Sequence, residues 1–176
     1  MRYWFSEIFK GLAKEDIRYV IVGGIAVNLL GVPRFTADLD IIVALEQKNV
    51  RKFVKCLTNL GFKPKVPVTA EMFTDHKNRA NWAKEKNMVV FSFWRPDRPY
   101  EVIDVFIKEP IPFKELWSKR EKIALENIKI PVVSIGHLVQ LKRRSGRLQD
   151  ISDIEALNKL SKELKSEKNG QDKKRG

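Results

Sequence analysis

Cysteine, histidine and long apolar runs are all scarce in this sequence. The single cysteine, Cys56, has no partner for an internal disulfide or for a structural zinc site. His76 and His137, the only two histidines, do not stand at a metal-ligand spacing from each other or from Cys56. The longest charge-free apolar stretch, residues 19–32, is shorter than the ~20 residues that a transmembrane helix needs. These absences argue against redox chemistry, a zinc centre and a membrane span.

Acidic residues are also in short supply, because 22 Asp and Glu stand against 34 Lys and Arg, which leaves a net charge of +12. A surface of this charge attracts polyanions, so a nucleic acid or a nucleotide is the expected class of partner. The first helical stretch carries Glu7 and Lys10 and does not resemble the apolar centre of a signal peptide. We therefore expect a cytoplasmic protein.

Apolar spacing predicts an α/β succession of elements around one core. Helices are expected over residues 3–15, 25–30 and 50–60, and strands over 19–22 and 39–43. Later elements are a hairpin over 88–93 and 101–107, a helical turn near 113–119, a short β pair over 122–130, and two C-terminal helices. Residues 61–69 could form at most an edge strand, and residues 70–87 fit either helix or loop.

Three regions follow from this succession. We expect residues 1–133 to form the core and residues 134–164 to pack on it as a helical pair. Residues 165–176 contain no apolar side chain, so a disordered, mostly basic tail is expected there.

Two aspartates open an otherwise apolar strand. Asp38 and Asp40 flank Leu39, so their side chains share one face of the strand with Cα atoms roughly 6.5–7 Å apart, close enough to share a divalent cation. Asp104 lies in the apolar run 102–107, where a charge is costly unless it is paired, metal-bound or at a cleft. A turn cap at Asp38 and ion pairs at the other two acids are the alternative explanation.

A glycine pair precedes these acids in the chain. Gly23 and Gly24 stand between a predicted strand and a predicted helix, where the backbone can approach a phosphate and the helix N-terminus supplies unpaired N–H groups. A tight turn that requires glycine for its geometry is the simpler alternative. The order of glycine turn, helix, Asp-x-Asp and a later acid is more specific than any of its parts.

The run from residue 19 to residue 43 resembles the signature of the nucleotidyltransferase superfamily. The closer likeness is to small prokaryotic members related to AbiEii-type toxins, which read Gly-Gly-x-Ala, then Arg-x-Thr or Arg-x-Ser, then Asp-x-Asp. The matching residues are Gly23, Gly24, Ala26, Arg34, Thr36, Asp38 and Asp40. A late helical motif of those relatives has its counterpart in Lys142, Arg147, Asp150 and Asp153. The likeness is weak between residues 61 and 99.

This resemblance implies a polymerase-β-like α/β fold, with a mixed sheet, flanking helices and a short C-terminal helical appendage. It makes Asp38, Asp40 and Asp104 the catalytic residues and the ligands of Mg²⁺, and it rests the triphosphate of an NTP on Gly23 and Gly24.

The remaining candidates have structural alternatives beside their functional ones. The resemblance makes Arg34, Thr36 and Lys142 nucleotide contacts. Arg34 and Thr36 could equally stabilise their loop, and Lys142 could belong to a solvated helix face. For Asp150 we favour capping of the last helix. Among the four tryptophans, Trp82 stands between basic residues and is the candidate for stacking on a base, whereas the others are expected to pack in the core or at its edge.

The resemblance implies transfer of an NMP group from an NTP to an acceptor hydroxyl. The positive charge favours RNA such as tRNA over a small cationic drug as the acceptor, and protein AMPylation stays open. A catalytically silent module that binds nucleotide or nucleic acid is the alternative. A toxin that pairs with an antitoxin is a further interpretation of the same chemistry, and a partner subunit or a second copy in a homodimer could complete the acceptor site.

Overall fold

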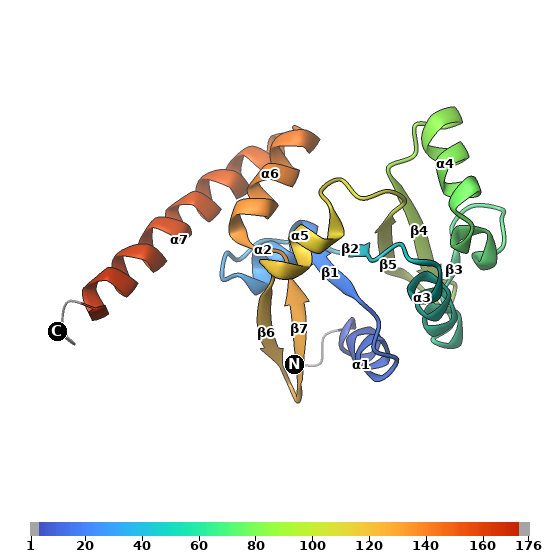
Figure 1. Cartoon of the computed structure of the whole chain (residues 1–176), viewed down its shortest axis with the longest axis horizontal. Coiled ribbons are helices and arrows are strands. Elements are labelled where there is room, and N and C mark those ends of the chain that lie inside the picture. The colour runs from blue at the N-terminus through green and yellow to red at the C-terminus, as the bar shows by residue number, and fades with distance from the viewer. Residues whose placement is uncertain (1–3, 173–176) are drawn as a thin grey trace.

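A seven-stranded mixed sheet forms the centre of the protein, in a computed structural model that describes residues 4–172. The strand order across the sheet is β3-β4-β5-β2-β1-β7-β6 (Figure 1). The strands are β1 (Tyr19–Val22), β2 (Leu39–Val43), β3 (Lys63–Pro64), β4 (Val90–Arg95), β5 (Arg98–Phe106), β6 (Glu121–Leu125) and β7 (Ile128–Val132).

Seven α-helices and one short 3₁₀ segment surround the sheet. They are α1 (Ser6–Lys14), α2 (Gly23–Leu29), α3 (Gln47–Asn59), η1 (Ala70–Thr74), α4 (His76–Glu85), α5 (Phe113–Ser118), α6 (Ile135–Ser145) and α7 (Leu148–Asp172). None of the described helices has the length and apolar character that crossing a membrane requires.

The centre of the sheet is built from short, apolar β-forming runs. All four residues of β1 are buried, and β1 pairs antiparallel with β2 and parallel with β7. Strand β2 also pairs parallel with β5, which in turn pairs antiparallel with β4. Parallel neighbours require a crossover, so residues far apart in the sequence become neighbours at the middle of the sheet.

The two faces of the sheet differ in how completely they are covered. On one face, Phe53 of α3 packs edge-to-face on Phe93, and Phe73 of η1 and Trp82 of α4 pack on Phe91. On the opposite face, Val20 and Ile42 are also fully buried. Helices α2 and α5 contact the central strands. The outward residues of β4 on this second face stay partly exposed.

The C-terminal helices are longer than the sequence pattern indicates. Helix α6 ends at Gly146, which adopts the left-handed backbone conformation, and α7 then runs away from the body of the protein (Figure 1). The expectation of a disordered tail from residue 165 is wrong for residues 165–172, which continue α7; residues 173–176 lie outside the described part. Lys165, Glu167, Lys168 and Gln171 are good helix formers, so the absence of apolar residues does not by itself end the helix.

The other expected elements are present, with small shifts at their ends. Strands β1 and β2 have the predicted bounds, whereas α2 begins at Gly23 rather than at Ile25. The undecided segment 70–87 forms η1 and α4. The structure is the expected mixed sheet with flanking helices and a C-terminal helical pair.

Candidate active site

Two of the three candidate aspartates lie side by side in the sheet. Asp40 of β2 is the register partner of Asp104 in β5, and parallel neighbours lie about 4.8 Å apart and point to the same face. Asp38 directly precedes β2, is exposed, and alternates onto that face as well. The side chain of Ser92, the register partner of Asp104 in β4, donates a hydrogen bond of 2.6 Å to an Asp104 carboxylate oxygen.

The carboxylates repel one another. Burial, followed by the charges of Asp104 and Asp38, raises the pKa of Asp40 to about 6, although Arg147 and Lys142 act in the opposite direction. Desolvation and the charge of Asp104 also raise the pKa of Asp38, and the positive charge of Lys65 opposes this shift. Within residues 4–172, none of the three aspartates forms a salt bridge.

The glycine pair lies directly against this site. A Cβ built on Gly23 would fall 1.9 Å from Oδ2 of Asp40, and the φ of Gly23 is +66°, so both the space and the backbone require glycine there. A Cβ built on Gly24 would fall 2.5 Å from Oγ1 of Thr36 and 3.0 Å from Cζ of Arg34. The structure thus brings Gly23, Gly24, Arg34, Thr36 and Asp40 together, as the sequence motif predicts.

A buried network of ion pairs joins the C-terminal helices to the loop before β2. The ammonium of Lys142 lies 2.9 Å from Asp150 Oδ1 and 2.6 Å from Asp153 Oδ2, and Asp153 also pairs with Arg34 at 2.5 Å. Asp153 and Lys142 are only 3% and 5% exposed. Such a network holds its members in place, because removing one partner would leave a buried charge unpaired.

These contacts revise the structural alternatives for the late motif. Lys142 does not lie on a solvated face, because it is buried between two aspartates. Asp150 accepts a hydrogen bond from the backbone N–H of Arg147 at the start of α7, which agrees with capping, and it also pairs with Lys142. Arg147 itself is exposed, and none of the salt bridges between described residues includes it.

The donor chemistry of the site fits Mg²⁺ through carboxylates and substrate phosphates. Mg²⁺ prefers oxygen ligands, keeps several waters, and commonly binds one or two carboxylates together with phosphate oxygens. No group of three or more His, Cys, Asp or Glu side chains in the described part of the chain is gathered closely enough to enclose an ion. The register pair Asp40 and Asp104 is therefore the core of the candidate metal site, with Asp38 beside it.

Two residues near the acids were missed by sequence reasoning, although one left a signal. Ser92 is the only polar residue in the predicted strand 88–93 and alternates onto the same face as Asp104. Lys65 gave no signal in the sequence, because only the pairing of the edge strand with β4 brings it near Asp38. Its backbone N–H donates a hydrogen bond to the Ser92 carbonyl. The expectation that Trp82 stacks on a base is wrong, because Trp82 is buried against Phe91.

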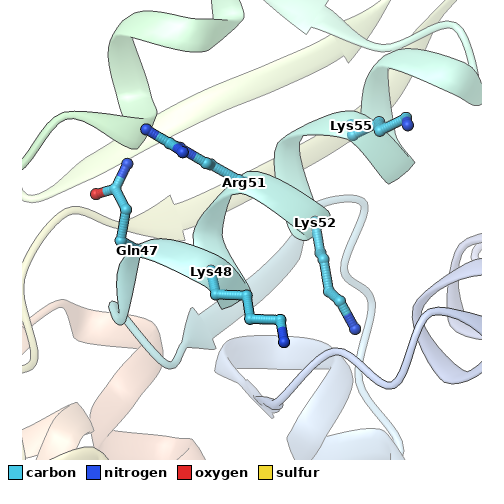
Figure 2. A pocket seen from close by; sticks show the side chains of 5 residues that line it. All are labelled: Gln47, Lys48, Arg51, Lys52 and Lys55. Atoms are coloured by element: carbon cyan, nitrogen blue, oxygen red, sulfur yellow. The ribbon is translucent and has the colours of Figure 1, made fainter.

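A surface hollow of about 480 Å³ lies elsewhere, on the outer side of α3 (Figure 2). It is lined by Gln47, Lys48, Arg51, Lys52 and Lys55. Helix α3 covers the face of the sheet opposite to the aspartates, because Phe53 packs on Phe93 whereas Ser92 and Asp104 point the other way. This basic hollow is thus separate from the candidate active site.

The chain matches a known protein family over most of its length. Residues 5–168 match the family described as nucleotidyltransferases of unknown function, DUF6036. The chain belongs to this family. The match does not extend to the narrower relation with AbiEii-type toxins, which stays a prediction, and no curated protein sequence matches the chain.

Solved structures agree with the polymerase-β-like nucleotidyltransferase fold. A lincosamide antibiotic adenylyltransferase, LnuA, with lincomycin bound is 17% identical with a TM-score of 0.57, and the match covers 87% of this chain and 93% of that one. ANT(2″)-Ia in complex with adenylyl-2″-tobramycin is 13% identical with a TM-score of 0.53, and the match covers 92% of this chain and 94% of that one. An antigenic nucleotidyltransferase-like protein from Paracoccidioides brasiliensis is 17% identical with a TM-score of 0.53, and the match covers 85% of this chain and 71% of that one.

We expect Gly24→Ala to lower the free energy of unfolding by about 1–3 kcal/mol, because the new methyl group overpacks against Thr36. Urea unfolding would measure this loss. Gly136→Ala in α6 is the matched control, since nothing lies within 4 Å of its Cβ position and alanine favours helix over glycine. Equal effects of the two substitutions would contradict the close packing at Gly24.

Asp40→Asn is expected to stabilise the protein in metal-free buffer. Because the folded-state pKa of Asp40 is raised to about 6, its ionisation opposes folding above pH 6, and this penalty disappears as the pH falls toward the unfolded value near 4. Urea unfolding with EDTA should show a gain of about 1–3 kcal/mol at pH 8 that shrinks between pH 6 and pH 4. Asp97→Asn, an exposed turn variant, should show no such trend, and a gain at Asp40 that is independent of pH would contradict the raised pKa of Asp40.

Proposed function

We propose that the protein is a Mg²⁺-dependent nucleotidyltransferase that transfers an NMP group from an NTP to an acceptor hydroxyl. The observation that carries this proposal is the register pairing of Asp40 with Asp104, beside Asp38, at a glycine turn. Like charges are held together there at a cost in stability, which a divalent cation with its nucleotide would remove. Membership of a nucleotidyltransferase family supports the same chemistry.

Each aspartate has a role in this reaction. Asp38, Asp40 and Asp104 would hold Mg²⁺, which when bound neutralises charge on the phosphates and lowers the pKa of a coordinated hydroxyl. The acceptor oxygen attacks the α-phosphorus in line, the new oxygen–phosphorus bond forms, and the bond to pyrophosphate breaks. Asp104 is the candidate to receive the hydroxyl proton, and the hydrogen bond from Ser92 fixes the orientation of its carboxylate.

The basic residues around the turn suit the triphosphate. Arg147 is exposed and close enough to lower the pKa of Asp40, so its guanidinium is available to phosphate oxygens. Lys142 and Arg34 are held against Asp153, and we propose that they act on the phosphates by their positive charge from these fixed positions. Thr36 and the backbone at Gly23 and Gly24 complete the nucleotide side of the site.

RNA is the acceptor that we propose, with tRNA as one example. The net charge of +12 attracts a polyanion and repels a cationic drug. The structures of LnuA with lincomycin and of ANT(2″)-Ia with an adenylylated tobramycin concern antibiotic acceptors, so a small-molecule acceptor is the competing outcome. A toxin role and an antitoxin partner stay predictions from the sequence resemblance, as does a homodimer.

Asp38→Asn, Asp40→Asn and Asp104→Asn should each lower NMP transfer by at least about 100-fold while the protein stays folded, because each removes a carboxylate from the metal site. The measurement is incorporation of label from each α-labelled NTP into total tRNA or cell extract, with Mg²⁺ or with EDTA. Circular dichroism checks the fold of each variant.

Asp97→Asn provides the matched control, since it removes an exposed acid from the β4–β5 turn and should leave transfer unchanged. Retained transfer in two of the three site variants would overturn the metal assignment. Nucleotide binding without any transfer by the parent protein would instead favour the silent binding module.

A further inference from the structure

The second face of β4 offers an aromatic surface next to the reacting carboxylates. Alternate residues of β4 share a face, so Trp94 lies on the same side of the sheet as Ser92. Ser92 is the partner of Asp104 and Trp94 is the partner of Val102, which makes Trp94 the diagonal neighbour of Asp104 at about 7–8 Å between Cα atoms. A flat side chain thus lies one step from the candidate general base.

Trp94 is not used by the core. Its neighbours Phe91 and Phe93 point to the opposite face, are fully buried, and pack on Phe73 and on each other. Trp94 is partly exposed, and within residues 4–172 it makes neither a ring contact nor a cation–π pair. Its ring is therefore available to a ligand that approaches this face.

Two lysines border this aromatic surface. Lys63 of β3 is the register partner of Trp94, and Lys65 bonds through its N–H to the carbonyl of Ser92. Both side chains are exposed, and neither forms a salt bridge with another described residue. Lys63 lies opposite Trp94 and Lys65 opposite Ser92, which is itself opposite Asp104, so the lysines and this acid share one face of neighbouring strands.

We infer that Trp94, Lys63 and Lys65 form the acceptor subsite, and that they bind the terminal nucleotide of a single-stranded RNA. This inference rests on the proposed function, because it requires the acceptor hydroxyl to react at Asp104. The base stacks on Trp94, and the lysines contact the phosphates that precede it. Asp104 lies on the neighbouring strand, one diagonal step from Trp94, which is within reach of the sugar of a nucleoside stacked there.

The chemistry of the surface favours an unpaired nucleotide over other polyanions. Stacking on an aromatic side chain needs an exposed base, which a single strand offers and a duplex does not. Lysines beside the ring supply the charge that a phosphate backbone seeks. The basic hollow on α3 has similar charge without an aromatic residue and lies on the opposite face, so it provides an internal control.

The test compares two fluorescently labelled ten-nucleotide RNAs of equal charge, one intact and one with an abasic 3′-terminal nucleotide. The parent protein should bind the intact RNA about tenfold more tightly or more, since stacking on an aromatic residue contributes at about that level. Trp94→Leu should abolish this preference, and Trp94→Phe should retain most of it. Trp117→Leu, at a half-buried tryptophan of α5, controls for loss of a large aromatic side chain.

A second comparison separates the lysines from general charge. The double variant Lys63→Gln with Lys65→Gln should weaken RNA binding and reduce its salt dependence. The double variant Lys48→Gln with Lys55→Gln removes the same charge from the opposite face and should have much less effect. Equal losses from both pairs, or an unchanged preference for the intact RNA in Trp94→Leu, would overturn the acceptor subsite.

Nucleotide binding is measured on the same variants to keep the two proposals apart. Trp94→Leu should bind Mg²⁺–NTP as tightly as the parent protein does and raise the KM for RNA while leaving the kcat nearly unchanged. If the parent protein binds Mg²⁺–NTP but shows no preference for the intact RNA, this inference fails and the proposed nucleotidyl transfer stands. The same holds if lincomycin binds at Trp94 and RNA does not. Absence of Mg²⁺–NTP binding in a folded parent protein would overturn both.

Discussion

The parallel pairing of β2 with β5 is the constraint on which the rest of the site depends. It sets Asp40 beside Asp104 at the middle of an apolar sheet, where the two charges repel and burial raises the pKa of Asp40. Neither carboxylate forms a salt bridge with another described residue, and the buried lysine and arginine nearby are held by Asp153 instead. The fold therefore concentrates negative charge at one point, which is the property that the proposed Mg²⁺ site requires.

The ion pairs of Asp153 explain why the C-terminal helices belong to the site. Asp153 of α7 bridges Lys142 of α6 and Arg34 of the loop before β2, so the position of the loop depends on a segment more than a hundred residues later in the chain. Thr36 and Arg34 in turn pack against Gly24. The glycine turn, the loop and the two helices consequently form one connected unit around the start of β2, while most of α7 extends beyond it (Figure 1).

Local patterns predicted the central elements and the site residues that lie on them. The apolar runs of β1 and β2 and the alternation of Asp38 and Asp40 are visible in the sequence because a strand has a period of two. The pairing of β5 with β2 and the contact of Arg34 with Asp153 are non-local, so no sequence window contains them. Trp82, the sequence candidate for stacking on a base, packs on Phe91 in the core, a long-range contact that no sequence window contains. Trp94 shares its face of the sheet with Ser92. Helix α7 exceeds its predicted end because the prediction ended it at the last apolar residue, whereas lysine, glutamate and glutamine can continue a helix that has no apolar face.

Equilibrium dialysis of an NTP with a non-hydrolysable α,β linkage tests the central claim most directly. The paired carboxylates are proposed to bind nucleotide through a divalent cation. The parent protein should bind this NTP at least about tenfold more tightly with Mg²⁺ than with EDTA, and the double variant Asp40→Asn with Asp104→Asn should lose that difference. Equal affinity of the parent protein in Mg²⁺ and in EDTA would contradict the account.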